Sequence, residues 1–327
     1  MCFFNKLLAA SCGITSVATA SAATFYVDAN VLNGNGNGSS WANAYTNLND
    51  ALAVANEGDQ IWVAEGSYYP DEGSGQSNDD PASTFTLING VDLLGGFPSG
   101  GGNGTLTARS PQSYITELSG DLQQNDNSSD NADHVLSARS MTSVTTIDGF
   151  TISDGSGRYG SGLIAATSSS LTLRNCKFQN NHAATYGGAI HAYISSLALI
   201  NCSFLDNSAG SYGGAIDTTS SATSTSQNSL TLTNCLFQNN SATYDGGAIY
   251  ASQSYILTLT NCSFEGNTAN TGGAILATGS TSLTLINSLL WNNGDAIVGN
   301  YTGLQNLIEG SAVDGTVVIA SEDPIFV

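Results

Sequence analysis

Apolar and polar residues alternate along the second half of the chain, and the alternation recurs as the motif Leu-x-Leu-x-Asn. In the copy that starts at Leu230, leucines alternate with threonines, so the leucines point to one side and the threonines to the other. β-branched residues on the polar side favour a strand. The pattern therefore predicts short strands that are each buried on one face. The motif begins at Leu171, Leu197, Leu230, Leu257 and Leu283.

These copies follow one another at intervals of 26, 33, 27 and 26 residues. A fixed period in this range is typical of a solenoid, in which each repeat buries its apolar face only against its neighbours. A coil of 26 residues is long enough for three short strands and three turns. We therefore predict an all-β fold, a right-handed parallel β-helix, whose hand follows from the right-handed bias of parallel crossovers. The longest copy holds a Ser/Thr-rich insertion near residues 218–229, which predicts a loop.

Two further motifs mark where each coil turns. Four copies continue Asn-Cys-x-Phe-x-x-Asn and then carry Gly-Gly-Ala-Ile, in which glycine allows the positive φ of a sharp corner. Stacked coils place equivalent residues in columns, about 4.8 Å apart. We expect an inner aromatic column from Phe178, Phe204, Phe237 and Phe264. We also expect two asparagine columns that hold turns, one at Asn175, Asn201, Asn234, Asn261 and Asn287 and one at Asn181, Asn207, Asn240, Asn267 and Asn293.

The first 23 residues have the features of a secretory signal: one basic residue, an apolar stretch and the small-residue cleavage site Ala20-Ser21-Ala22. We expect residues 24–327 to form one β-helix domain. The apolar spacing predicts a helix from Trp41 to about Asn56, which would cover the open end of the solenoid. The domain then divides into a cap strand and helix (24–60), irregular coils (61–165), regular repeats (166–303) and a C-terminal coil in which the repeat fades (304–327).

One cysteine occupies the same position in each of four repeats. We favour a column of buried, reduced thiols that pack as small hydrophobic groups. The alternative is one or two disulfides between adjacent coils, because an exported protein meets an oxidising compartment. These residues are Cys176, Cys202, Cys235 and Cys262.

The charge balance narrows the classes of partner. The chain has six Lys and Arg against 26 Asp and Glu, a net charge of −20. A nucleic-acid site needs a basic surface, so the composition argues against nucleic acid. It also argues against an acidic polysaccharide as an electrostatically steered substrate. After the signal, no stretch reaches the about 18 consecutive apolar residues of a membrane-spanning helix.

The paired motifs Gly-Gly-Ala-Ile and Phe-x-x-Asn resemble the repeats of the polymorphic outer membrane proteins, a family of surface-exposed bacterial β-helix adhesins. The N-terminal part is similar to exported bacterial β-helix proteins of the pectin-lyase-like superfamily. The resemblance implies a β-helix that is secreted, extracellular or held at the outer cell surface, and it implies adhesion. The N-terminal motifs are Phe25-Tyr26-Val27-Asp28-Ala29, Ser39-Ser40-Trp41-Ala42-Asn43-Ala44, Gly58-Asp59-Gln60-Ile61-Trp62-Val63-Ala64 and Ile147-Asp148-Gly149-Phe150.

Tyrosines precede the glycine corner in successive coils. An exposed tyrosine column would stack on sugar rings or anchor a protein partner; the alternative is an aromatic stack that only stabilises the turn. A histidine and an aspartate are expected side by side on neighbouring coils next to it. The candidate binding residues are Tyr159, Tyr186, Tyr212, Tyr244, His191 and Asp217.

Carboxylates gathered on one loop are candidate calcium ligands, because calcium prefers oxygen. The alternative is a solvated acidic loop, since the spacing matches no known calcium motif. No other cofactor is predicted. The candidate ligands are Asp121, Asp126, Asp130 and Asp133.

Two functions remain from these observations. The first hypothesis is a secreted or cell-surface, non-catalytic protein that binds an extracellular glycan or a host or cell-surface protein. The alternative is a polysaccharide lyase or glycoside hydrolase of the pectin-lyase-like superfamily. A lyase needs a basic residue and a cation that neutralises the uronate, and a hydrolase needs two facing carboxylates. Acidic pairs on neighbouring coils arise by stacking alone, so the sequence favours the non-catalytic hypothesis.

Overall fold

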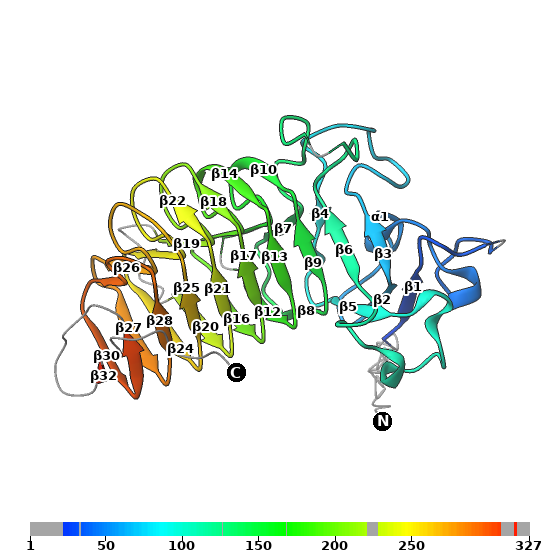
Figure 1. Cartoon of the computed structure of the whole chain (residues 1–327). Coiled ribbons are helices and arrows are strands. Elements are labelled where there is room, and N and C mark those ends of the chain that lie inside the picture. The colour runs from blue at the N-terminus through cyan, green and yellow to red at the C-terminus, as the bar shows by residue number, and fades with distance from the viewer. Residues whose placement is uncertain are drawn as a thin grey trace, which may run out of the picture.

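The computed structural model describes residues 22–32, 34–125, 127–167, 169–220, 228–308 and 317–318. Most of the expected secretory signal and of the insertion near residues 218–229 lies outside these ranges. The described chain winds into a solenoid of stacked coils (Figure 1). Strands of successive coils pair in parallel, with like residues in register, as in Phe178 with Phe204. The predicted right-handed parallel β-helix is confirmed.

Two long sheets, A and B, run the length of the solenoid. Sheet A contains, in spatial order, β1 (Thr24–Val27), β2 (Gln60–Ala64), β5 (Asp92–Phe97), β8 (Thr145–Asp148), β12 (Ser170–Arg174), β16 (Ser196–Ile200), β20 (Asn228–Thr233), β24 (Tyr255–Thr260), β27 (Ser282–Ile286) and β30 (Tyr301–Leu304). Sheet B contains β3 (Gly66–Tyr68), β6 (Thr116–Ser119), β9 (Thr151–Ser153), β13 (Lys177–Gln179), β17 (Ser203–Leu205), β21 (Leu236–Gln238), β25 (Ser263–Glu265), β28 (Leu289–Trp291), β31 (Asn306–Ile308) and β32 (Val317–Val318).

Two shorter sheets, C and D, complete the coils. Sheet C contains β4 (Phe85–Thr86), β7 (Leu136–Arg139), β11 (Leu163–Ala166), β15 (Ile190–Tyr193), β19 (Ile216–Thr219), β23 (Ile249–Ser252), β26 (Ile275–Thr278) and β29 (Ile297–Val298). Sheet D contains β10 (Ser156–Tyr159), β14 (His182–Tyr186), β18 (Ser208–Ala209) and β22 (Ser241–Ala242). Sheet D is a difference from the predicted three-strand coil. It forms because small residues such as Ala183 and Ala209 point into the core there and let the chain run extended before the glycine corner.

The N-terminal helix is much shorter than predicted. Instead of one helix from Trp41 to about Asn56, the chain forms η1 (Trp41–Asn43) and α1 (Leu48–Leu52). The backbone of Tyr45 prevents a continuous helix, because its N–H donates to Tyr26 and its carbonyl accepts from Asp28 of the first coil, at 2.9 and 2.8 Å. Two further 3₁₀ turns, η2 (Ser99–Gly101) and η3 (Leu106–Ala108), lie in loops. Nevertheless, α1 packs its leucines into the end of the core.

The aromatic column is confirmed. The rings of Phe178, Phe204, Phe237 and Phe264 stack with centroid distances of 5.1, 4.7 and 4.6 Å and within 5° of parallel. All four rings are fully buried. Each ring therefore contributes both buried apolar area and an aromatic contact to each neighbouring coil.

The asparagine columns hold turns, as predicted. In the buried column, the Asn207 amide donates to Asn240 Oδ1 and to the Phe178 carbonyl, both at 3.0 Å. In the exposed column, each corner residue has a left-handed backbone, with φ of 54° at Asn234, and its amide donates to the previous coil. Asparagine tolerates this conformation better than most residues. The four repeat cysteines are buried free thiols.

Candidate functional site

Four tyrosine rings stack along one edge of the regular coils, and we call Tyr159, Tyr186, Tyr212 and Tyr250 the tyrosine strip. The first two pairs have ring centroids 5.4 Å apart, with interplanar angles of 21° and 4°. The third pair, Tyr212 and Tyr250, is 4.8 Å apart at 18°. The strip is therefore a continuous stack across four coils.

Local backbone geometry places the rings. Tyr159 and Tyr186 end neighbouring strands of sheet D, and Tyr212 continues their column by a parallel bridge. Tyr186 and Tyr212 each precede a glycine with a positive φ, which is 63° at Gly213. A Cβ at Gly213 would lie 2.3 Å from the Ile216 carbonyl oxygen, so the corner accepts only glycine. The tight corner fixes the direction in which the preceding ring leaves the coil.

In the fourth coil the corner position no longer holds a tyrosine. Asp245 takes the corner position next to Tyr212, and Tyr244 lies one residue earlier with 52% of its surface exposed. The Tyr244 ring is tilted by 52° from Tyr212 at a centroid distance of 6.1 Å. Tyr250 of β23 fills the vacated stacking position. Tyr244 therefore flanks the end of the strip and is not a member of the stack.

A histidine–carboxylate pair lies beside the strip. Paired positions of β15 and β19 bring His191 next to Asp217, with Nδ1 2.7 Å from Oδ2. The Thr219 hydroxyl donates to the same carboxylate oxygen at 2.9 Å. Asp217 is 1% exposed, and no described residue donates a hydrogen bond to its Oδ1. The imidazole packs 5.6 Å from the Tyr159 ring, so the pair and the strip form one surface.

The structure thus brings together five of the six candidate residues and places Tyr244 at their edge. Sequence reasoning missed Tyr250, Tyr193 and Thr219. Tyr193 is 38% exposed and lies 6.5 Å from the His191 ring. The signal for Tyr250 was present, because it follows Gly-Gly-Ala-Ile just as His191 and Asp217 do.

The two ends of the strip have different electrostatic surroundings. Burial, and then the nearby Asp217 carboxylate, raise the pKa of Tyr250 above its ordinary value. At the other end, the Arg158 guanidinium lies 5.0 Å from the centroid of the Tyr159 ring. Because the rings stack face to face, their faces contact one another. Their edges and hydroxyls are the parts left for a partner.

The candidate calcium ligands lie on the loop that follows β6, and this loop reaches β10, because the Ser156 N–H donates to the Ala132 carbonyl at 2.8 Å. Asp130 Oδ2 accepts from the side-chain amide of Asn125 at 3.0 Å, and Asp121 Oδ1 accepts from the Asn125 backbone at 3.2 Å. Asp133 is exposed, and Asp126 lies outside the described residues. Within the described ranges, no three His, Cys, Asp or Glu side chains form a group that would hold a metal ion by themselves. Any ion there would need amide or backbone oxygens as well.

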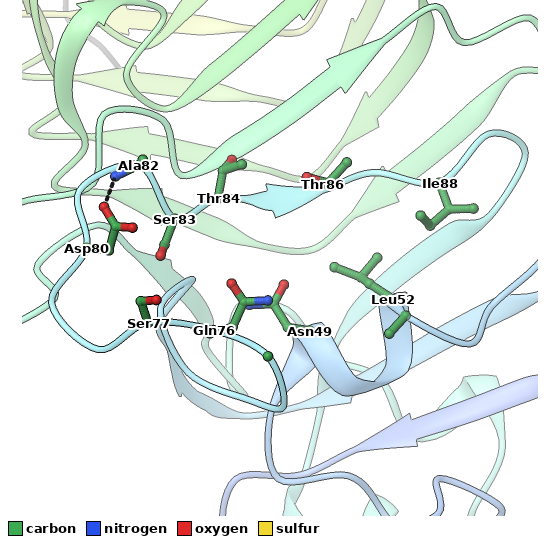
Figure 2. A pocket seen from close by; sticks show the side chains of 12 residues that line it. Asn49, Leu52, Gln76, Ser77, Asp80, Ala82, Ser83, Thr84, Thr86 and Ile88 are labelled. Atoms are coloured by element: carbon green, nitrogen blue, oxygen red, sulfur yellow. Dashed lines mark hydrogen bonds between the residues drawn. The ribbon is translucent and has the colours of Figure 1, made fainter.

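The hollows found among the described residues lie away from the strip, and two of them are described here. Figure 2 shows the first, a pocket of 420 Å³ between α1 and the loop that leads into β4, with Asn49 and Leu52 facing Thr84 and Thr86. The second, of 620 Å³, lies at the corner between sheets A and B and includes Lys177. None of the described helices combines the length and apolar composition needed to cross a bilayer.

Comparisons with known proteins bear on the architecture. A family model described as "Right handed beta helix region" matches residues 114–256, and one described as "Chlamydia polymorphic membrane protein (Chlamydia_PMP) repeat" matches residues 261–278. No curated protein matches the chain. Among solved structures, a rhamnogalacturonan lyase is similar with a TM-score of 0.48 and 12% identity, over 91% of this chain and 85% of that chain. The two family matches confirm part of the resemblance drawn from the motifs: a right-handed β-helix with a repeat like those of the polymorphic membrane proteins.

Proposed function

We propose that this chain is a non-catalytic β-helix of the cell surface or extracellular space that binds a protein partner through the tyrosine strip. The carrying observation is the strip itself, a row of stacked rings beside a buried histidine–carboxylate pair. The repeat match supports a surface location, because that repeat is named for membrane proteins.

Ring orientation favours a protein over a sugar. Stacking on a sugar ring needs an open aromatic face, whereas Tyr186 is covered on one side by Tyr159 and on the other by Tyr212. Ring edges and hydroxyls instead fit a flat protein surface, where tyrosine supplies apolar area and a hydrogen bond with few rotamers to fix. The exposed Tyr244 is the ring with an open face, so a glycan would be expected to depend on it.

The test is a binding assay on immobilised extracellular-matrix proteins, cell-surface proteins and a glycan array. We expect protein binding that the double variant Tyr186→Ala/Tyr212→Ala weakens by about 2 kcal/mol or more, roughly thirtyfold, as for tyrosine hot spots. Tyr114→Ala is the matched control, because Tyr114 is a partly exposed tyrosine outside the repeats. Unchanged binding by the double variant would rule out the strip, and binding to glycans alone that Tyr244→Ala abolishes would replace a protein by a sugar.

A second function is favoured by one observation, the geometry of His191. A histidine that donates from Nδ1 to a buried carboxylate keeps Nε2 as an acceptor, the arrangement of a general base. This geometry would serve a polysaccharide lyase or glycoside hydrolase. Incubation with pectate, alginate and neutral plant glycans, with and without calcium, tests it by the absorbance of unsaturated products and by new reducing ends. Turnover that His191→Ala abolishes would establish catalysis; no turnover on any of them would leave the binding function.

A further inference from the structure

Most of the basic residues of this acidic chain gather at one pocket, the hollow of 620 Å³ at the corner between sheets A and B. Lys177 lines the pocket. Arg174 directly precedes the lining residue Asn175, and Arg109 directly precedes the lining residue Ser110. Beyond the expected secretory signal the chain has five basic residues, so three of the five lie at or beside this pocket. The five are Arg109, Arg139, Arg158, Arg174 and Lys177.

The positive charge at the pocket is only partly balanced by carboxylates. Arg109 forms an ion pair with Asp148 at 3.1 Å, and the Asn175 side-chain amide donates to the same carboxylate at 2.8 Å. Among the described residues, neither Arg174 nor Lys177 takes part in an ion pair. The pocket therefore offers uncompensated positive charge within a chain of net charge −20, and this local charge attracts an anion.

Lys177 lies on the outer face of sheet B between uncharged neighbours. In β13 it pairs with Thr151 of the preceding coil and with Ser203 of the following coil. The same column holds Glu117 two coils away, but the Glu117 carboxylate accepts from two serine hydroxyls at 3.0 and 2.9 Å. Lys177 is half-buried. Its ammonium therefore attracts an anion more strongly than a fully hydrated one, because the effective dielectric constant is lower there.

A fixed loop between β5 and β6 forms one wall of the pocket. Arg109 anchors this loop, because its Nε donates to the Gly95 carbonyl at 2.7 Å and a terminal nitrogen donates to the Asp148 carbonyl at 2.9 Å. Pro111 packs directly on Gly149, where a Cβ would lie 2.7 Å from Pro111 Cγ. The wall is therefore formed before a ligand arrives, which lowers the entropic cost of binding.

The lining combines an apolar surface with a polar edge. Pro111 and Ile115 supply the apolar surface, and Ile115 is 49% exposed. Asn201 and Ser203 supply an amide and a hydroxyl. The Asn201 amide donates to Asn175 Oδ1 at 3.2 Å, which fixes its direction and leaves its second N–H for a ligand. A sugar ring has the same division, with C–H groups on its faces and hydroxyls around its rim, so the lining suits a sugar.

We propose that this pocket binds a terminal acidic sugar of an extracellular glycan, with the sugar carboxylate on the Lys177 ammonium. The ring packs on Pro111 and Ile115. The loop between β5 and β6 stands at one end of the pocket, and the lining continues to Ser203 of β17 at the other, so the glycan leaves towards β17. Sialic acid and uronic acids share the required chemistry, a sugar ring that carries a carboxylate.

This pocket is a local exception to the acidic character of the chain. The overall charge argues against an acidic glycan that is attracted by the whole molecule, whereas a single terminal sugar meets only the basic corner. The pocket is separate from the tyrosine strip, so its ligand stands or falls independently of the proposed protein partner.

The experiment titrates the full chain with sialyllactose, with trigalacturonate and, as an uncharged reference, with lactose. We expect an acidic sugar to bind and its affinity to fall as added salt screens the charge. Lys177→Gln removes the charge from an outer strand position, and we expect it to weaken binding about tenfold or more without changing the melting temperature. Ser203→Asp places a carboxylate beside Lys177 on the next coil and should weaken binding as strongly, because it competes with the ligand.

The matched control is Arg139→Gln, which makes the same change in net charge at an exposed position of β7 in sheet C. It should leave the affinity unchanged. Binding of one acidic sugar alone would show whether the ligand carries sialic acid or a uronic acid. Three results would overturn the proposal: no binding of either acidic sugar at millimolar concentration, equal binding of lactose, or an equal loss of affinity in Arg139→Gln. The last result would mean general attraction to positive charge in place of a site.

Discussion

The regular coils and the irregular coils share the same sheets but satisfy their polar groups in different ways. In the regular coils, each buried asparagine bonds the asparagine of the next coil, as Asn207 bonds Asn240. In the irregular coils, long loops replace the corners, and among the described residues no donor reaches the buried oxygen Asp71 Oδ1. A stacked column therefore supplies its own hydrogen-bond partners, whereas a residue that is not repeated, such as Asp71 or Asp217, has no equivalent neighbour to bond.

The largest expected effect comes from breaking the aromatic column. Phe204→Ala removes a fully buried ring that stacks on Phe178 and on Phe237. We expect a loss of about 3–5 kcal/mol in the free energy of unfolding, from lost burial and a cavity. Urea denaturation followed by circular dichroism measures it. Leu205→Ala, at the neighbouring outward position, is the control; an equal loss there would mean that the column has no special role.

The next effect tests the buried asparagine column. Asn207→Ala removes the acceptor of the Asn181 N–H and of the Asn181 side-chain amide, and it removes the amide that donates to the Phe178 carbonyl. We expect a loss of about 1–3 kcal/mol in the free energy of unfolding, because buried polar groups then remain unsatisfied. Hydrogen exchange should locate the loosened amides at this corner of three adjacent coils. Protection that is unchanged at Asn181 would contradict the ladder.

A smaller effect on stability is expected at alkaline pH from one buried tyrosine in each region. Burial raises the pKa of Tyr68 in the irregular coils and of Tyr255 in the regular ones. Because the folded pKa exceeds the unfolded value of about 10, this stability is complete below pH 10 and falls above it, by at most about 1.4 kcal/mol per pH unit for each residue. Melting temperatures between pH 8 and about pH 11 measure the slope. Tyr255→Phe should flatten it; an unchanged slope would exclude Tyr255 as a source.

The smallest effect concerns the exposed asparagine column. Asn234→Gly removes the hydrogen bond that the Asn234 side-chain amide donates to Asn201 Oδ1 at 3.1 Å. Glycine still adopts the left-handed backbone conformation of this corner. We expect a loss of no more than about 0.5 kcal/mol in the free energy of unfolding, and a loss of about 1–2 kcal/mol for Asn234→Ala, which adds strain. Chemical denaturation of the two variants checks the order. Both variants lack the amide, so a larger loss for glycine than for alanine would contradict the strain expected from the left-handed corner.

The regular coils could be predicted from sequence because each copy repeats the same motif, so that the structure assigned to one copy applies to the others. Once Phe178 and Phe204 share a motif position, parallel register stacks their rings, and the same reasoning orders the asparagines. The prediction of one helix from Trp41 was wrong because the backbone of Tyr45 forms hydrogen bonds with the first coil. No local sequence pattern reveals this contact. Sheet D was missed because small residues such as Ala183 carry a weak strand signal.

The candidate sites divide in the same way. His191 and Asp217 could be paired from their repeat positions, and Tyr250 could have been added because it occupies the same position of the next repeat. The contact between Asp133 and Pro81 could not be deduced, because it depends on two unique loops that leave neighbouring strands. Periodicity predicts columns, whereas contacts between unique loops depend on three-dimensional placement.

The most direct test of the tyrosine strip is a position-specific crosslink. A photoreactive benzoylphenylalanine replaces Tyr212 in one variant and Tyr114 in another, and each is irradiated with the protein partner identified in the binding assay. We predict a covalent complex from position 212 and none from position 114, because only the former lies in the strip. Equal crosslinking from both positions, or crosslinking from position 114 alone, would contradict the proposed binding surface.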